Sequence, residues 1–117
     1  MRLVFVFLVF CFLSVFLAPA YAHPPQDISI TYHPSTKILV AVIVHNVNDP
    51  KKHYIKKVDI GLNGKEIIQQ EISIQDNNST QTVTYMVPEA KAGDRVSVEA
   101  YCSISGKLEK EIKITDK

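Results

Sequence analysis

The sequence contains two cysteines and no tryptophan among 117 residues. Cys11 lies in an apolar N-terminal stretch that we expect to be removed, which leaves Cys102 as the single thiol. The expected mature chain therefore cannot form an internal disulfide bond. A lone cysteine is most often a small buried hydrophobic side chain, and this is the simplest interpretation of Cys102.

The sequence also lacks an excess of charge of either sign. Lysine and arginine total 13 against 12 aspartate and glutamate residues, and loss of Arg2 with the N-terminal stretch leaves 12 against 12. Nucleic-acid binding needs clustered basic residues, so this class of function is excluded. No serine lies in a recognisable nucleophile motif, and the carboxylates show no paired arrangement. Hydrolysis has no support, and the sequence names no catalytic residue.

The first 22 residues have the pattern of a secretory signal peptide. A single arginine supplies the positive charge, residues 3–17 are almost entirely apolar, and Ala20 and Ala22 occupy the small positions of an Ala-x-Ala cleavage site. The apolar run is short for a membrane span. We therefore expect a signal peptide over 1–22 and one mature domain over 23–117. That domain should be secreted or periplasmic and have no stable membrane anchor.

After the signal peptide, the sequence carries no helix signal and consists of short β-type runs separated by turn residues. The expected strands span residues 28–32, 38–44, 54–62, 65–74, 80–87, 95–103 and 108–115. Asn63-Gly64 is a strong hairpin signal because both residues tolerate positive φ. About seven short strands at this spacing predict an all-β fold, an immunoglobulin-like β-sandwich.

The alternation within the runs predicts which side chains face the core. Val58 shares a face of its strand with Ile60, and Val96 shares a face with Cys102. The run ILVAVIV at 38–44 is apolar on both faces, which is typical of a central strand that is covered on both sides. We expect Cys102 to point toward the core from the end of its strand.

The stretch HNVNDPKKHYI at 45–55 carries two histidines around an Asp-Pro turn. His45 ends one expected strand and His53 precedes the next, so both should lie at the same rim of the sandwich. The strand order decides whether Cys102 joins them. Two imidazoles and a thiolate suit a borderline transition-metal ion. The alternative is a polar turn that happens to carry two imidazoles.

The segments LVAVIVHNVNDPKKHYIKKVDI and VSVEAYCSISGKLEKEIKI resemble the superoxide reductase family, the ferrous-iron domain of desulfoferrodoxin and neelaredoxin. The resemblance implies that His45 and His53 bind Fe(II), with Cys102 as the axial thiolate. It also implies a one-electron reduction of superoxide, with Lys51 and Lys52 attracting the anion. Without such a site, these two lysines are a solvated loop tip.

The resemblance to that family is incomplete at two ligand positions. The family's iron is bound by four histidine nitrogens and one cysteine sulfur, but here Ser105 and Gln26 stand where two of the histidines are expected. His23 lies three positions from Gln26 and is a candidate fourth ligand. Superoxide reduction should therefore be slow or absent, so whether the protein is an oxidoreductase stays open.

A second resemblance points to a different class of function. HYIKKVDIGLNGKEI and AKAGDRVSVEA are similar to the Z subunit of the thiosulfate-oxidising Sox carrier complex. This similarity implies a β-sandwich that binds a partner protein and has neither metal nor catalytic activity. Cys102 discriminates between the two alternatives, because only a metal site needs a thiol at that position.

Other metals and partners follow from the same residues. Zinc accepts nitrogen and sulfur ligands, and copper would compete for them or bind a mature N-terminal His23 through its amine and imidazole. The expected partners are an electron-donor or carrier protein. A homo-oligomer is a further alternative.

Overall fold

The computed structural model describes residues 23–116, which form seven strands and no helix. The strands are β1 (Asp27–His33), β2 (Ile38–Val44), β3 (Ile55–Leu62), β4 (Lys65–Glu71), β5 (Thr80–Met86), β6 (Arg95–Cys102) and β7 (Lys107–Lys113). The predicted signal peptide at 1–22 lies outside the described residues. No helix in the described part is long and apolar enough to cross a membrane.

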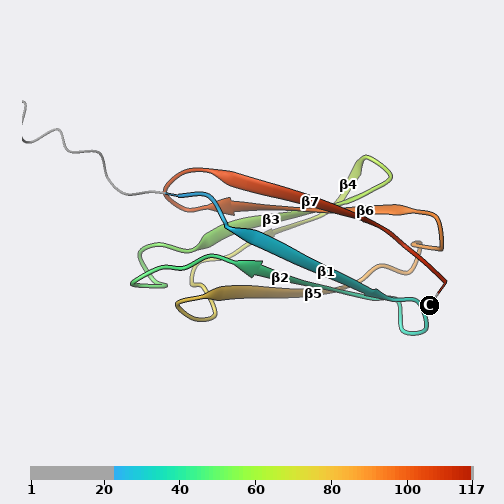
Figure 1. Ribbon diagram of the computed structural model, residues 1–117, viewed down its shortest axis with the longest axis horizontal. Helices are drawn as coiled ribbons and strands as arrows, with labels where there is room; N and C mark the ends of the chain where they lie inside the picture. The colour runs from blue at the N-terminus through green and yellow to red at the C-terminus, as the bar shows by residue number, and fades with distance from the viewer. Residues whose placement is uncertain (1–22, 117) are drawn as a thin grey trace, which may run out of the picture.

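The strands form two antiparallel sheets that pack face to face (Figure 1). One sheet has the order β1-β2-β5, and the other has the order β4-β3-β6-β7. β4 pairs with β3 rather than with β5, so the second sheet has four strands and the first has three. The predicted all-β sandwich of about seven strands is confirmed. Sheets of this kind bury one face each and leave the other toward solvent.

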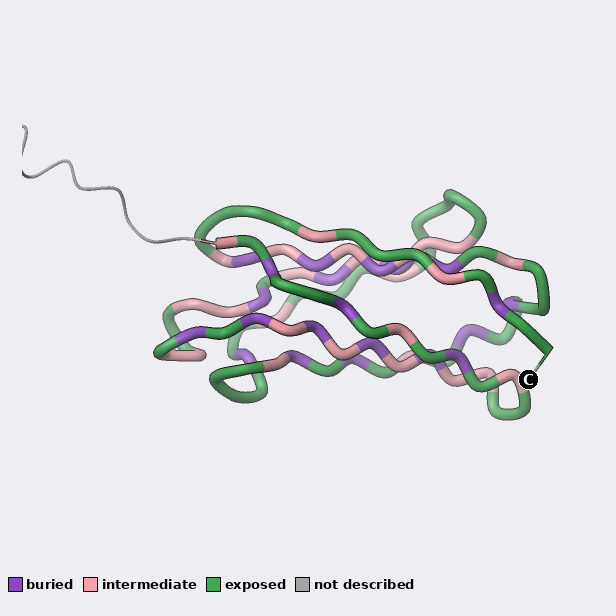
Figure 2. Tube along the Cα trace, viewed as in Figure 1, coloured by how far each residue is buried: buried purple, intermediate pink, exposed green. Residues whose placement is uncertain are grey.

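The core lies between the sheets and is built from alternate residues of the central strands (Figure 2). Val58 and Ile60 of β3 are fully buried, as are Val96 and Val98 of β6, and Cys102 is 2% exposed. These faces were predicted correctly. In β2, only the inward face of 38–44 is buried, and the other face is half-exposed. The expectation of cover on both sides was wrong because a two-layer sandwich has no third layer.

The turn between β3 and β4 agrees with the prediction from the sequence, whereas the end of β4 does not. Asn63 and Gly64 both have positive φ, 51° and 85°, in the β3–β4 hairpin, as the turn signal predicts. The fourth predicted strand, 65–74, is too long, because β4 ends at Glu71. Beyond it the chain leaves the sheet and carries Gln75 into the interior, where 2% of its surface is exposed.

One rim of the sandwich collects the ends of four strands. The register pairs Asp27 of β1 with Val44 of β2, and Ile55 of β3 with Cys102 of β6. The chain therefore enters β1 and β3 at the same end of the molecule at which it leaves β2 and β6 (Figure 1). The histidines next to these strand ends face one another there.

Candidate metal centre

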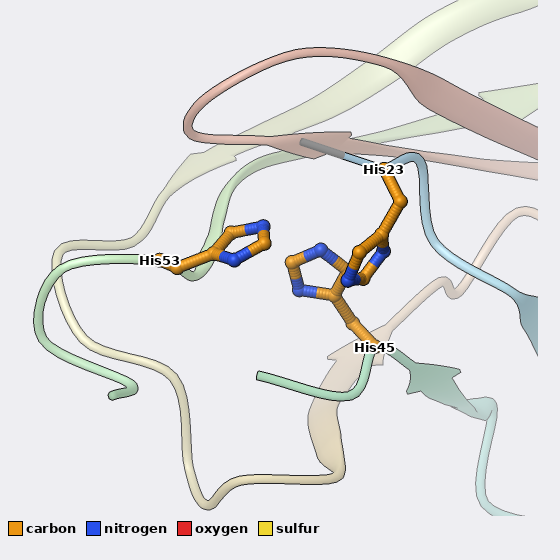
Figure 3. Close-up of side chains that lie close together, drawn as sticks. All are labelled: His23, His45 and His53. Atoms are coloured by element: carbon orange, nitrogen blue, oxygen red, sulfur yellow. The ribbon is translucent and has the colours of Figure 1, made fainter. Parts of the chain in front are cut away.

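Three histidines from three separate segments come together at this rim (Figure 3). His23 precedes β1, His45 follows β2 directly, and His53 lies just before β3. The ring centroids are 5.0 Å apart for His23 and His45, 5.0 Å for His23 and His53, and 4.8 Å for His45 and His53. One nitrogen from each ring lies within 4.8 Å of the other two. A group of this kind could hold a metal ion.

The loop between His45 and His53 is folded by its Asp-Pro turn. The Asp49 carboxylate accepts a hydrogen bond from the Lys51 amide at 3.0 Å, and the Asp49 carbonyl accepts one from the His53 amide at 2.9 Å. At the other end, the His45 amide donates to the Ser79 carbonyl at 2.9 Å. Such side-chain and backbone bonds stabilise tight turns. The turn returns the chain so that both imidazoles face the same space.

Gln75 determines which ring nitrogen of His45 carries the proton. Its amide nitrogen donates to the carbonyls of His45 and Asn77, at 2.8 and 2.9 Å. Its amide oxygen accepts from the Ile55 backbone N–H at 3.1 Å and contacts His45 Nδ1 at 2.8 Å. Because both amide hydrogens are already donated, Nδ1 of His45 must be the donor in the last contact. In the neutral ring, Nε2 of His45 is therefore the unprotonated nitrogen.

That nitrogen has nothing to bind among the described residues. His45 is fully buried, and its Nε2 has no hydrogen-bond partner within residues 23–116. A buried acceptor without a partner costs about 1–3 kcal/mol. A buried imidazole nitrogen beside two further imidazoles is an arrangement that a metal ion could satisfy. Sequence reasoning missed Gln75, since nothing in its local sequence marks it as buried.

Burial also keeps two of the rings uncharged. Desolvation lowers the pKa of His45 below its ordinary value, and the hydrogen bond to Gln75 opposes this effect only in part. Desolvation also lowers the pKa of His53, with further lowering from His45 and His23. A metal ion binds the neutral imidazole. Both rings are therefore in the binding form at neutral pH.

Cys102 lies next to His53, but it is not one of the residues whose ligand atoms all lie within 4.8 Å of one another. Its Sγ is 3.1 Å from His53 Nε2 and accepts a weak hydrogen bond from the Ile104 amide at 3.5 Å. It is a free cysteine. The pair shares one proton, either as a thiol donating to the imidazole or as an imidazole N–H donating to a thiolate. The strand order therefore brings Cys102 to the histidines, next to one of them.

The remaining predicted residues take different places. His23 Nδ1 is 3.1 Å from the Pro24 carbonyl, which can only accept, so the proton of His23 is on Nδ1 and Nε2 is free. Gln26 is engaged elsewhere, because its side-chain oxygen accepts from the Asn46 amide at 3.1 Å. Lys51 and Lys52 are exposed at the loop tip. No measured contact gives either lysine a role.

A cavity of about 460 Å³ opens beside the cluster. His23 and His53 line it together with the polar side chains of Asn46, Asn48 and Asn78. His45 and Cys102 are not part of its lining and lie on the buried side of the cluster. A metal ion between the imidazoles would therefore have protein on one side and this cavity on the other.

Comparisons with protein families, with curated proteins and with solved structures find no match to this chain. The function of this chain is therefore inferred from the geometry of the site and from the chemistry of its residues.

Proposed function

We propose that this protein binds a transition-metal ion through His23, His45 and His53, with the Cys102 thiolate as an additional ligand. The observation that carries the proposal is the buried Nε2 of His45, which Gln75 leaves unprotonated and which has no partner among residues 23–116. A metal ion removes that cost. A structural role for His45 alone gives no reason to bury an unpaired nitrogen.

The donor atoms fit a mixed nitrogen and sulfur site after a small closure. In a tetrahedral site with metal–nitrogen bonds of about 2.0 Å, the ligand nitrogens lie about 3.3 Å apart. The three imidazole nitrogens here are within 4.8 Å of one another, so binding requires them to approach by up to about 1.5 Å. The His53 Nε2 to Cys102 Sγ distance is 3.1 Å. Bonds of about 2.1 and 2.3 Å at a right angle place nitrogen and sulfur at about this separation.

Fe(II) is the metal that we propose, with zinc as the principal competitor. Three imidazoles and one thiolate would supply nitrogen and sulfur ligands that iron and zinc both accept, and the cavity beside His23 and His53 has room for a further small ligand. Iron bound there would supply one-electron chemistry. The superoxide reductase resemblance then suggests the reaction in which superoxide takes one electron and two protons to give hydrogen peroxide. A partner protein would have to return the electron to the oxidised iron.

Metal titration of the purified domain tests the proposal. The metal-free protein should bind one Fe(II), Co(II) or Zn(II) ion per chain, and the oxidised iron form should show a visible thiolate-to-iron band. His45→Ala should abolish binding, and Cys102→Ser should remove the band while the fold remains. His33→Ala is the matched control, because His33 is exposed at the opposite end of β1. The proposal would be overturned if the wild-type protein bound each of these metals with no higher affinity than the His45→Ala variant.

The alternative function is a partner-binding sandwich without metal, and one surface feature favours it. A groove of about 390 Å³ lies between the edges of the two sheets, lined in part by Ile67 of β4 and Met86 of β5. Both side chains are unusually exposed for apolar residues, at 38% and 63%. This function does not account for the unpaired His45 nitrogen or for the thiol beside His53. The metal titration decides between the two.

A further inference from the structure

Gly106 touches the segment that carries His23. It lies in the four-residue loop between β6 and β7 and has a φ of +90°. A Cβ atom added to Gly106 would lie 2.9 Å from the Cα of Pro24, 2.9 Å from its Cβ and 3.0 Å from its nitrogen. Two of these three atoms belong to the backbone and cannot rotate away. No side chain fits at this position unless the N-terminal segment moves.

The same loop also contacts the two other parts of the site. The Cys102 amide donates to the Gly106 carbonyl at 2.9 Å. The Ser103 amide donates to the Tyr54 carbonyl at 2.8 Å, and the Tyr54 amide donates to the Ser103 hydroxyl at 3.1 Å, directly after His53. Residues 103–106 therefore lie against all three segments that supply His23, His53 and Cys102.

The N-terminal segment is fixed by bonds only beyond Pro24. Gln26 donates its amide to the Val44 carbonyl at 2.8 Å and accepts from the Asn46 amide. Among the described residues, His23 itself has no hydrogen bond except the one to the Pro24 carbonyl. Besides the His45 and His53 rings, each 5.0 Å from the His23 ring, the contact of Pro24 with Gly106 is packing that limits where His23 points.

We propose that Gly106 is the residue that positions His23 as a metal ligand. The proposal rests on the proposed metal site and identifies what completes it. An ordinary carbon–carbon contact needs about 3.5 Å or more, so a methyl group at residue 106 would displace Pro24 by several tenths of an ångström. Metal binding already requires the three imidazole nitrogens to approach one another, and a displaced Pro24 would hinder that approach. A shift of this size at the residue next to His23 would weaken binding without removing a ligand.

Gly106→Ala is the test variant, and Gly93→Ala is its matched control. Gly93 has a φ of +92°, and an added Cβ there meets nothing within 4 Å. Both variants carry the same kind of backbone strain, but only Gly106→Ala disturbs Pro24. We expect the Co(II) affinity of Gly106→Ala to fall 10- to 100-fold, in the range found for residues that orient a ligand. The affinity of Gly93→Ala should stay within about twofold of wild type.

A double-mutant cycle with His23→Ala shows whether the effect passes through His23. If it does, Gly106→Ala should weaken Co(II) binding in the wild type and have no further effect in the His23→Ala background. Equal affinities of the Gly106→Ala and Gly93→Ala proteins, or additive losses in the cycle, would overturn the inference. A wild-type protein that binds no Co(II) would instead refute the proposed metal site itself. If Gly106→Ala does not fold, Pro24→Gly replaces it, and its affinity should fall in the same His23-dependent way.

Discussion

Gln75 has no spare hydrogen-bonding capacity, and this is what makes His45 a candidate ligand. Its four contacts tie the end of β2, the start of β3 and the loop before β5 to one side chain. A satisfied buried amide of this kind specifies one arrangement of its neighbours. The arrangement includes the tautomer of His45, and hence the direction in which its free nitrogen points.

Replacing Gln75 by alanine should affect both stability and metal binding. The change leaves several buried partners unpaired, so we expect the free energy of unfolding to fall by about 2–4 kcal/mol. The Co(II) affinity should fall about 10- to 100-fold, because the His45 ring loses its orientation. Chemical denaturation and Co(II) titration measure the two effects.

Gln81→Ala is the control for that variant. Gln81 is also a buried glutamine, 5% exposed, and its hydrogen bonds go to Asp76 and Thr82 rather than to a histidine. The Gln81→Ala variant should be less stable than the wild type, but its folded form should bind Co(II) with the wild-type affinity. Equal affinity losses in the two variants would mean that Gln75 acts through general stability and not through His45.

The buried histidines also predict how the metal-free protein responds to acid. The pKa values of His45 and His53 are lowered in the folded state, chiefly by desolvation. Below a pH of about 6.5 the unfolded chain binds protons that the folded chain does not. The stabilisation is therefore present above that pH and is lost as the pH falls through this range. Each such histidine contributes a slope of at most about 1.4 kcal/mol per pH unit.

Urea denaturation of the metal-free protein between pH 7 and pH 5 measures this slope. In His45→Gln the slope should be smaller, since one buried titrating group has been removed. In His33→Ala it should be unchanged, because His33 is exposed. A free energy of unfolding that stays constant over this range in the wild type would contradict the prediction.

At the scale of strands, β3 and β6 leave little room for a side chain at one position of β3. Gly61 of β3 lies opposite Ser97 of β6, at a point where the pairing of β3 with β4 shifts. A Cβ at Gly61 would approach the Ser97 hydroxyl oxygen to 2.4 Å but stay 3.8 Å from its Cβ. Glycine is common where a strand is irregular and a neighbour approaches closely.

Gly61→Ala should therefore destabilise the domain, and the substitution Ser97→Ala should remove most of that loss. We expect a loss of about 1–3 kcal/mol from overpacking, reduced to less than about 1 kcal/mol in Ser97→Ala protein, which lacks the clashing oxygen. Denaturation of the two single variants and the double variant gives the coupling free energy. An equal cost of Gly61→Ala in both backgrounds would show that the contact is not its cause.

The strands were predictable from the sequence because their signals are local. Alternation over a few residues predicted the buried faces of β3 and β6, and the Asn63-Gly64 turn predicted the hairpin between β3 and β4. His45 and His53 could be placed at one rim for the same reason. Strand order is not local, so the meeting of Cys102 with His53 stayed open. Gln75 is unpredictable because two of its partners, His45 and Ile55, are 30 and 20 residues away in the sequence.

At the scale of the whole molecule, the metal site would join the two sheets. His45 follows β2 of the three-stranded sheet, whereas His53 and Cys102 lie at the ends of β3 and β6 in the four-stranded sheet. In antibody domains, a disulfide bond between the second and sixth strands connects the sheets. Residues 23–116 contain no second cysteine for such a bond. A metal ion at this rim would supply the missing cross-link between β2 and β6.

Metal loading should therefore raise the stability of the domain, by an amount that grows with the logarithm of the free metal concentration. A ligand at one hundred times its dissociation constant adds about 2.7 kcal/mol to the free energy of unfolding. For a domain of this size, that corresponds to a rise in melting temperature of roughly 10–20 °C. Thermal unfolding with Co(II) or Zn(II), monitored by circular dichroism, measures the change.

If the metal ion links the two sheets, the stabilisation that it gives should depend on which ligand is removed. His45→Ala should lose nearly all of it, because His45 is the fully buried imidazole of the cluster and directly follows β2 of the three-stranded sheet. His23→Ala should keep part of it, since His45, His53 and Cys102 still join β2 to β3 and β6. Metal loading should stabilise the His33→Ala variant by as much as it stabilises the wild type. If the metal stabilised His45→Ala as much as the wild type, the ion would bind elsewhere, and the two sheets would be held together by their apolar core alone.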